Sequence, residues 1–368
     1  MQNRNRPHKH NGIELLDRLA IEHPIFLAPM AGGPGTPELV AAVSNAGGLG
    51  SFGGAYSTPE ALSEDIARIR TLTNRPFSIN LFAGAYRSDM EVDASPMLNI
   101  LRKIHTEWNL PEPVLPSLPA DPFPAQLEVV LATRPSAFSF TFGIPSPEQI
   151  SRLKAQDIVI MGTATTVNEA NMLEKAGVDA IIAQGLEAGA HRGSFAQSFE
   201  VSMVPTLELV RGIARTVSCP VIASGGIMNG GDIVQAMAAG ASAVQLGTAF
   251  LPCPECGAAP AYKQAILSAR EDTTQITRAF SGRPARGLKN RFMEMVGERS
   301  DVILPYPLQN ALTRPMRTAA GKRGDREYLS LWAGQGVSRA RQMPAADLVR
   351  VLVEEMQQAE TGRQRGSA

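Results

Sequence analysis

Cysteine is scarce in this chain of 368 residues: it has 3, too few for the disulfide framework of a small secreted protein. Neither sign of charge dominates, since 35 Lys and Arg balance 35 Asp and Glu, which argues against nucleic-acid or polybasic membrane binding. No apolar run approaches the roughly 20 residues of a membrane span, and the N-terminus lacks the apolar core of a secretory signal. We therefore expect a cytoplasmic globular protein.

What the chain does have is a repeated pattern of short apolar runs, each followed by glycine and then by a segment of helical periodicity. Eight such runs occur, at 25–30, 49–54, 77–82, 137–143, 157–163, 180–185, 221–227 and 243–250. Parallel strands that are covered on both faces are near-continuously apolar. Eight strand–helix units predict a closed α/β TIM barrel, (β/α)8, rather than an open doubly wound sheet, with its site at the carboxyl ends of the strands.

Two segments are longer than a bare barrel needs. Residues 83–136, after the third strand, contain a predicted helix and a proline-rich stretch that suits a wall or lid. Residues 251–360 form a predicted C-terminal extension of helix and loop, which ends in an amphipathic helix at roughly 345–359. The predicted organisation is a flexible tail, one domain and a disordered tail, at 1–12, 13–360 and 361–368.

Glycine-rich sequences follow the seventh and eighth predicted strands, SGGIMNGGD (Ser224–Asp232) and QLGTAF (Gln245–Phe250). Only glycine lets backbone N–H groups approach a phosphate closely, and barrel enzymes bind phosphates at these two loops. Glycines also make ordinary tight turns, but two adjacent glycine-rich loops favour a phosphate site. The candidate donors are Gly225, Gly226, Gly247 and Thr248.

The loop after the sixth strand, AQGLEAGAHRGSF, contains His191, the only histidine at the predicted mouth of the barrel. An imidazole can transfer protons near neutral pH or hold a positive charge beside an anion. A lone histidine is usually structural, but its position among glycines and beside Arg192 favours a catalytic role. Gln184, at the end of the strand, offers an amide to a flat heterocycle.

Two further strands end in candidate binding residues. Pro29, Met30 and Ala31 follow the first strand, where Met30 can pack against a planar ring or simply fill the core. Asn80 lies at the mouth end of the third strand, where a buried amide requires polar partners.

Other patterns carry less weight. Cys253 and Cys256 have CxxC spacing, but no second pair or nearby histidine completes a zinc site, so no metal is expected. The basic run 283–291 (RPARGLKNR) is typical of a solvated turn, with steering of an anion as the alternative.

Taken together, the strings PIFLAPMAGG, SNAGGLGSFGG, FSFTFG, QGLEAGAHRGSF, ASGGI and QLGTAFL resemble the nitronate monooxygenase family over about residues 13–340. LPYPLQNALTRPMR (Leu304–Arg317) and SLWAGQG (Ser330–Gly336) are similar to its class I branch. The sequence departs from the usual motif at Ala190, where glycine is commoner. Thr141 stands where some relatives have a second histidine.

The resemblance implies a TIM barrel that binds FMN non-covalently. It implies His191 as the active-site histidine, and Tyr306 and Arg314 as residues of the substrate pocket. The implied FMN contacts are Pro29, Met30, Ala31, Asn80, Gln184, Gly189, Gly226, Gln245, Leu246, Gly247 and Thr248.

The implied reaction is the oxidation of alkyl nitronates, typified by propionate 3-nitronate, with O₂ to an aldehyde-level product and nitrite. The principal alternative is an NAD(P)H-dependent FMN reductase of quinones or of enoyl-acyl carrier protein. A flavin-binding protein with little catalysis and a flavin-free barrel acting on a sugar phosphate are further alternatives. The sequence leaves open the protonation state of His191 and the oligomeric state.

Overall fold

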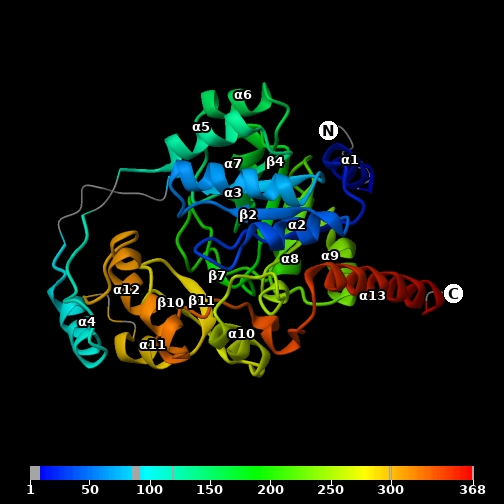
Figure 1. The fold of residues 1–368 in the computed structure, drawn as a ribbon. Helices are drawn as coiled ribbons and strands as arrows, with labels where there is room; N and C mark the ends of the chain where they lie inside the picture. The colour runs from blue at the N-terminus through cyan, green and yellow to red at the C-terminus, as the bar shows by residue number, and fades with distance from the viewer. Residues whose placement is uncertain (1–8, 85–91, 118–119, 298, 300, 367–368) are drawn as a thin grey trace.

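The computed structural model describes residues 9–84, 92–117, 120–297, 299 and 301–366. Its centre is a closed sheet of eight parallel strands, as the apolar runs predicted (Figure 1). They are β1 (Ile25–Leu27), β2 (Gly50–Gly53), β3 (Phe77–Phe82), β4 (Ala137–Thr141), β5 (Val159–Ala164), β6 (Ala180–Gln184), β8 (Val221–Ser224) and β9 (Ala243–Leu246). The order is β1-β9-β8-β6-β5-β4-β3-β2, and a parallel bridge between Phe26 and Leu49 joins its two ends. The fold is therefore a TIM barrel.

Helices surround the sheet and begin and end where the sequence provides caps. They are α2 (Pro37–Asn45), α3 (Pro59–Leu72), α5 (Phe123–Thr133), α6 (Pro147–Lys154), α7 (Val167–Ala176), α8 (Thr206–Ala214) and α9 (Gly230–Ala239). Thr36 and Ser146 accept hydrogen bonds from the first turns of α2 and α6. The Ala-Gly pairs at 176–177 and 239–240 predict glycine helix stops, and the structure confirms them: Gly177 and Gly240 end α7 and α9 with φ of +88° and +111°.

The last helix, α13 (Ala345–Gly366), is the eighth helix of the ring, because it packs against both α9 and α2 (Figure 1). Of the docking face predicted at Leu348, Val351, Leu352 and Met356, Leu348 and Leu352 are buried, whereas Val351 and Met356 are partly buried and Val349 takes their place. The helix continues beyond the predicted end at 359 and includes residues 361–366 of the segment predicted as a disordered tail.

The amino end of the barrel is closed by α1 (Lys9–Leu19). Leu15 and Leu19 join a buried cluster with inward-facing strand residues such as Ile182 and Ile222. This helix begins inside the segment predicted as a tail, and residues 1–8 lie outside the described part of the chain.

Between β9 and α13, residues 248–344 form an elaboration that we call the cap. It contains α10 (Pro260–Leu267), α11 (Arg291–Val296), α12 (Leu308–Arg323), β10 (Thr274–Thr277) and β11 (Ala285–Leu288). β10 and β11 form a three-stranded antiparallel sheet with β7 (Ala190–His191), which belongs to the loop after β6. The sequence did not predict this sheet, because its strands are short and partly polar.

The basic run 283–291 was predicted as a solvated turn, and this prediction is wrong. It contains the central strand β11, and Arg286 is 7% exposed. Arg286 donates Nε–H to the carbonyl oxygen of Leu186, at 3.1 Å. The run is buried because β11 pairs with β10 on one side and with β7 on the other.

The insertion after β3 reaches the cap. Its first helix, α4 (Ser95–Glu107), packs against α12, and Trp108 contacts Tyr328 edge-on with ring centroids 4.8 Å apart. Its second helix, α5, is the barrel helix that follows β3. Residues 85–91 and 118–119 of the insertion lie outside the described residues.

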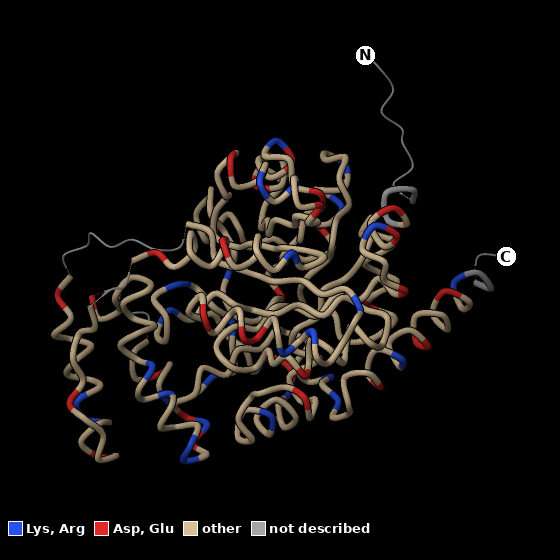
Figure 2. Tube along the Cα trace, turned by 45° about the horizontal axis from the view of Figure 1, so that its top comes forward, with Lys and Arg blue, Asp and Glu red and all other residues tan. Residues whose placement is uncertain are grey.

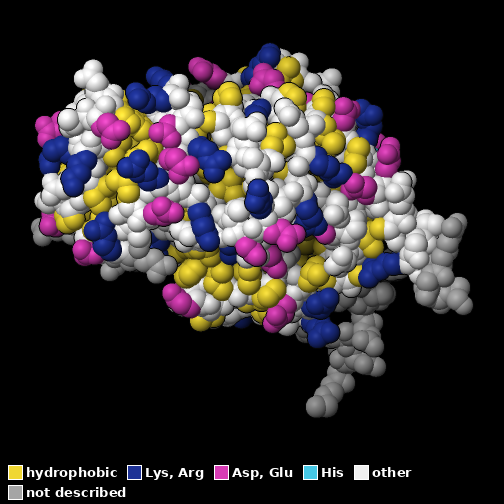
Figure 3. Space-filling view, turned by 90° about the horizontal axis from the view of Figure 1, so that it is seen from below, with side chains coloured by type: hydrophobic (Ala, Val, Ile, Leu, Met, Phe, Trp, Pro, Cys, Tyr) yellow, Lys and Arg dark blue, Asp and Glu magenta, His cyan; other side chains and the backbone are white. Residues whose placement is uncertain are grey.

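Charge is distributed without a dominant field. Figure 2 shows Lys and Arg interspersed with Asp and Glu along the outer helices. The face seen in Figure 3 likewise mixes both signs with hydrophobic side chains. In the described part of the chain, no helix has the length and apolar character needed to cross a bilayer.

Candidate active site

A cavity of about 490 Å³ lies between the carboxyl ends of the strands and the cap. This volume is within the usual range for small-molecule and cofactor sites. Every residue that the sequence proposed as a cofactor, substrate or catalytic contact, except Tyr306, lines it. These are Pro29, Met30, Ala31, Asn80, Gln184, Gly189, His191, Gly225, Gly226, Gln245, Leu246, Gly247, Thr248 and Arg314.

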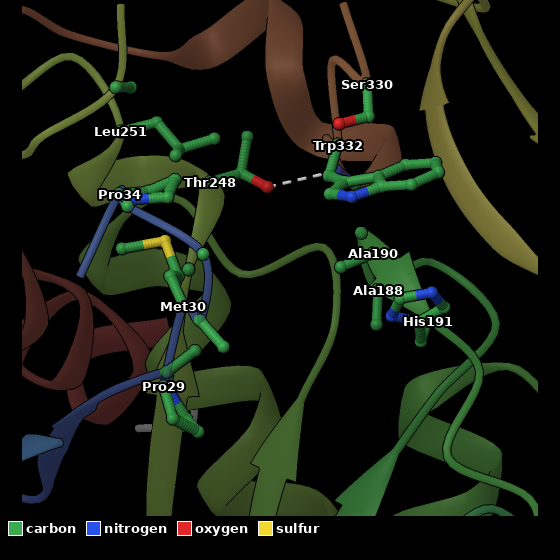
Figure 4. Close-up of a pocket in the computed structure, with 18 of the residues that line it drawn as sticks. Pro29, Met30, Pro34, Ala188, Ala190, His191, Thr248, Leu251, Ser330 and Trp332 are labelled. Carbon is green, nitrogen blue, oxygen red and sulfur yellow. Dashed lines mark hydrogen bonds between the residues drawn. The ribbon is translucent and has the colours of Figure 1, made fainter. Parts of the chain in front are cut away.

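One end of the cavity is built from backbone. Gly225 and Gly226, directly after β8, have φ of +128° and +73°, a region that side-chain-bearing residues rarely adopt. A Cβ atom on Gly226 would lie 3.0 Å from Cβ of Glu187. Thr248 Oγ1 accepts a hydrogen bond from the N–H of Gly334, at 2.9 Å, which ties this end to the cap (Figure 4). Bare backbone of this kind suits a phosphate group.

The middle of the cavity is a slot with apolar walls. Figure 4 shows Pro29 and Met30 on one side, and His191 and Trp332 on the other. Two walls of this kind, facing each other across a gap, suit a planar ring system.

Gln184 lines the cavity, but its amide is already engaged by the loop after β6. Its Nε2 donates to the carbonyl oxygen of His191, at 3.0 Å, and its Oε1 accepts from the N–H of Gly193, at 2.7 Å. The amide therefore fixes the position of the histidine. Asn80 similarly donates Nδ2–H to Ser139 Oγ, at 2.9 Å.

Arg192, next to the histidine, points away from the cavity and holds the same loop. Its Nη1 donates to the carbonyl oxygens of Gln184 and Gly185, at 2.6 and 2.7 Å, and its Nε donates to Ser202 Oγ, at 3.2 Å. Burial lowers its pKa to about 10, so it stays charged at neutral pH. Arg192 is therefore a structural clamp.

His191 is held by the cap. Its strand β7 pairs with β11, and its Nε2 lies 2.8 Å from Oγ of Ser281, a residue 1% exposed. The Ser281 hydroxyl also contacts the backbone of Arg283, whose N–H donates to it at 3.3 Å. The imidazole is thus fixed from behind by a chain segment about ninety residues away in sequence.

The environment keeps His191 neutral. Burial lowers its pKa to about 3, and the positive charges of Arg283 and Arg317 add to this effect. Aromatic rings enclose it, with the Trp332 and Tyr306 centroids 5.7 and 6.1 Å from its own. At physiological pH the ring is therefore an uncharged donor and acceptor of hydrogen bonds.

The wall contributed by α12 is cationic. Arg314 is exposed at the rim, whereas Arg317, three residues further along the helix, is partly buried. Nη2 of Arg317 donates to the backbone oxygen and Oδ1 of Asn310, at 2.7 and 2.9 Å. Burial lowers the pKa of Arg317 to about 10, which leaves it charged at neutral pH. Among the described lining residues there is no Asp, Glu or Lys.

Sequence reasoning missed Arg317, Ser281 and Trp332. The strings that contain Arg317 and Trp332 were part of the family resemblance, and the spacing of three from Arg314 was a usable signal for Arg317. Ser281 had no signal, since only the pairing of β7 with β11 brings it to His191.

Tyr306 is placed behind the cavity wall. It is 7% exposed and packs in an aromatic cluster with Phe142, Phe82 and Tyr56. Its centroid is 6.5 Å from that of Phe142, so it supports the rings around His191.

The cysteine pair is buried in the cap. Burial raises the pKa of the Cys253 thiol to about 12 and also raises that of Cys256. Within the described ranges, no cluster of three His, Cys, Asp or Glu side chains could hold a metal ion.

Comparison with known proteins defines the class and then the family. The family model described as nitronate monooxygenase matches residues 14–355. A relative named "Probable nitronate monooxygenase" from Staphylococcus aureus strain Newman is 41% identical, over 95% of this chain and 98% of its own length. The protein is an oxidoreductase on a TIM barrel. The chain belongs to the nitronate monooxygenase family, whose members are flavin-dependent.

Two solved structures are also similar to this chain over nearly its whole length. A nitroalkane oxidase from Streptomyces ansochromogenes is 41% identical, has a TM-score of 0.87, and aligns over 95% of this chain and 99% of its own. FabK from Thermotoga maritima is 30% identical, with a TM-score of 0.76, and aligns over 96% of this chain and 99% of its own.

Proposed function

We propose that this protein is an FMN-dependent monooxygenase that oxidises alkyl nitronates with O₂ to an aldehyde-level product and nitrite. Propionate 3-nitronate is the substrate type. The observation that carries the proposal is a cavity with a bare backbone end and an arginine wall without carboxylates. The first suits a cofactor phosphate and the second an anionic substrate.

The lining residues fit FMN. Backbone at Gly225, Gly226, Gly247 and Thr248 would hold the phosphate, and the slot beside Met30 would hold the ring. The contacts are all non-covalent. Bound there, the flavin supplies the electron acceptor that oxidation of the nitronate requires.

The neutral state of His191 favours a nitronate over a nitroalkane. A nitroalkane must lose a proton from carbon, and an imidazole with a pKa of about 3 is a weak base for that step. A nitronate has already lost this proton. We therefore assign His191 to hydrogen bonding and orientation of the substrate.

A reductase that takes electrons from NAD(P)H, and passes them to a quinone or an enoyl-acyl carrier protein, is the second candidate. The likeness to FabK favours it. The arginine wall does not decide against it, because NAD(P)H is also anionic.

The test is to mix the FMN-loaded protein anaerobically with propionate 3-nitronate and, separately, with NADH, and to follow the flavin absorbance. We expect a rapid change in flavin absorbance with the nitronate and little change with NADH. When the nitronate reaction is run in air, we expect nitrite to be formed. Rapid bleaching by NADH alone would assign the protein to the reductases. A flavin that responds to neither would indicate a binding protein, and a protein that retains no FMN would favour the flavin-free alternative.

A further inference from the structure

We propose that Arg317 binds a carboxylate at the far end of the substrate and so selects nitronates that carry this second negative charge. The inference rests on the proposed function and adds a specificity-determining residue to it. The sequence had placed Arg314, not Arg317, in the substrate pocket.

Arg317 carries a charge that the described protein does not balance. It forms none of the ion pairs found among the described residues, and no acidic side chain among them lines the cavity. A partly buried cation without an ionic partner is unfavourable, so an anion bound to it contributes more binding free energy than it would at an exposed arginine.

The hydrogen-bonding capacity of Arg317 is only partly used. Asn310 occupies Nη2. Nη1 has one long contact, 3.5 Å from Ser330 Oγ, and Nε is buried without a partner in the described part of the chain. The guanidinium is thus held in place by one group and keeps donors for a ligand. Its planar fork matches a carboxylate better than a point charge does.

Arg314 and Arg283, two other arginines near the cavity, are less suited to binding a carboxylate. Arg314 is exposed at the rim, where water and salt screen its charge. Arg283 donates Nη2–H to the carbonyl oxygen of Ser194, at 3.1 Å, and stacks 3.8 Å from the ring of Phe142. The charge of Arg317 also contributes, after burial and Arg283, to the lowered pKa of His191. Both residues line the same cavity, so in this proposal the substrate lies with its nitronate at His191 and its carboxylate at Arg317.

The experiment compares two nitronates of similar shape. Propionate 3-nitronate carries a carboxylate, and 3-methylbutyl 1-nitronate has an isopropyl group in its place. We expect the wild type to prefer the first in kcat/KM. Arg317→Met should lower kcat/KM for the carboxylated substrate by about 10- to 100-fold, mainly through KM, and change the other little. Arg317→Lys should retain part of the preference.

The matched control is Arg323→Met, on the same helix α12 but stacked over Trp108, outside the cavity. It should leave the preference unchanged. FMN content is measured in every variant: normal content in Arg317→Met shows that the fold is intact and that Arg317 does not hold the cofactor phosphate.

A second readout needs no turnover. Succinate has a carboxylate at each end, and we expect it to perturb the flavin spectrum of the wild type but not of Arg317→Met. The inference is overturned if the wild type has equal kcat/KM for the two nitronates, or if Arg317→Met lowers kcat/KM equally for both. Loss of FMN from Arg317→Met would also overturn it. If the wild type oxidises neither nitronate, the proposed function fails, and the succinate titration still decides on Arg317.

Discussion

The two ends of the cavity are built by different means. The phosphate-type end consists of backbone from the barrel itself, at Gly225, Gly226 and Gly247, a few residues after the strands that carry them. The other end consists of side chains from the cap, and His191 is fixed there by Ser281. Backbone amides serve any phosphate, whereas placed side chains discriminate between substrates. The proposed function therefore assigns cofactor binding to the barrel and substrate choice to the cap.

The largest expected effect tests the backbone end. Gly226→Val should reduce the FMN retained per protein more than tenfold, because the new side chain strains a φ of +73° and crowds Glu187. Flavin absorbance relative to total protein measures this. The control is Gly324→Val, which has a nearly equal φ of +69° but open space around it and no place in the cavity. If both variants lose FMN, backbone strain alone explains the loss; normal FMN in Gly226→Val would place the phosphate elsewhere.

The next effect tests the side-chain end. His191→Ala should retain FMN but lower kcat/KM for the nitronate about 100-fold, because the ring lines the wall opposite Met30 and is not part of the glycine-rich loops that would hold the phosphate. His23→Ala, just before β1 and outside the cavity lining, is the control. Loss of FMN in His191→Ala would contradict the proposed separation of cofactor binding from substrate binding. Full activity of this variant would show that His191 has no role in the reaction.

A third prediction uses the lowered pKa of His191. In the unfolded chain this imidazole takes up a proton below its ordinary value of 6.5, whereas in the folded chain it does so only near 3. The unfolded state therefore binds more protons in this window, and stability falls as the pH falls. Between pH 7 and pH 5 the wild type should lose about 2 kcal/mol more than His191→Asn. Urea unfolding at both pH values measures this, and equal losses would show that the folded imidazole titrates normally.

The smallest effect concerns Ala190, which precedes the histidine with a φ of +62°. Ala190→Gly relieves about 1 kcal/mol of strain, but it adds about 0.4–1 kcal/mol of chain entropy to the unfolded state. The net change in stability should stay below about 1 kcal/mol, whereas Ala42→Gly inside α2 should cost about 1 kcal/mol. Thermal unfolding measures both, and equal destabilisation would show that Ala190 is unstrained.

Sequence reasoning worked best where the determining interactions are local. The eight strands of the barrel are apolar on both faces, so each could be recognised without its neighbours. The stops at Gly177 and Gly240 depend only on the left-handed backbone of one residue. Most of the cavity lining could be predicted for the same reason, since it lies at the ends of these strands.

Prediction failed where a residue's role depends on contacts distant in sequence. The run at 283–291 is polar and short, and only its partners β7 and β10 make it a buried strand. Gln184 lines the cavity as expected, but nothing in the sequence indicated that the returning loop also engages its amide.

The sequence by itself determined the barrel, its glycine-rich end and the membership of the family. Each of these depends on residues close together in the chain: the apolar runs of the strands, the glycines that follow them, and the family's motifs. Only the tertiary structure decided which charged groups face the cavity. Arg192 bonds to backbone carbonyls, Arg314 lies at the exposed rim, and Arg317 lies in the wall. Burial and charge balance, which set the pKa of His191, depend on every element packed around a group and so have no signature in its own stretch of chain.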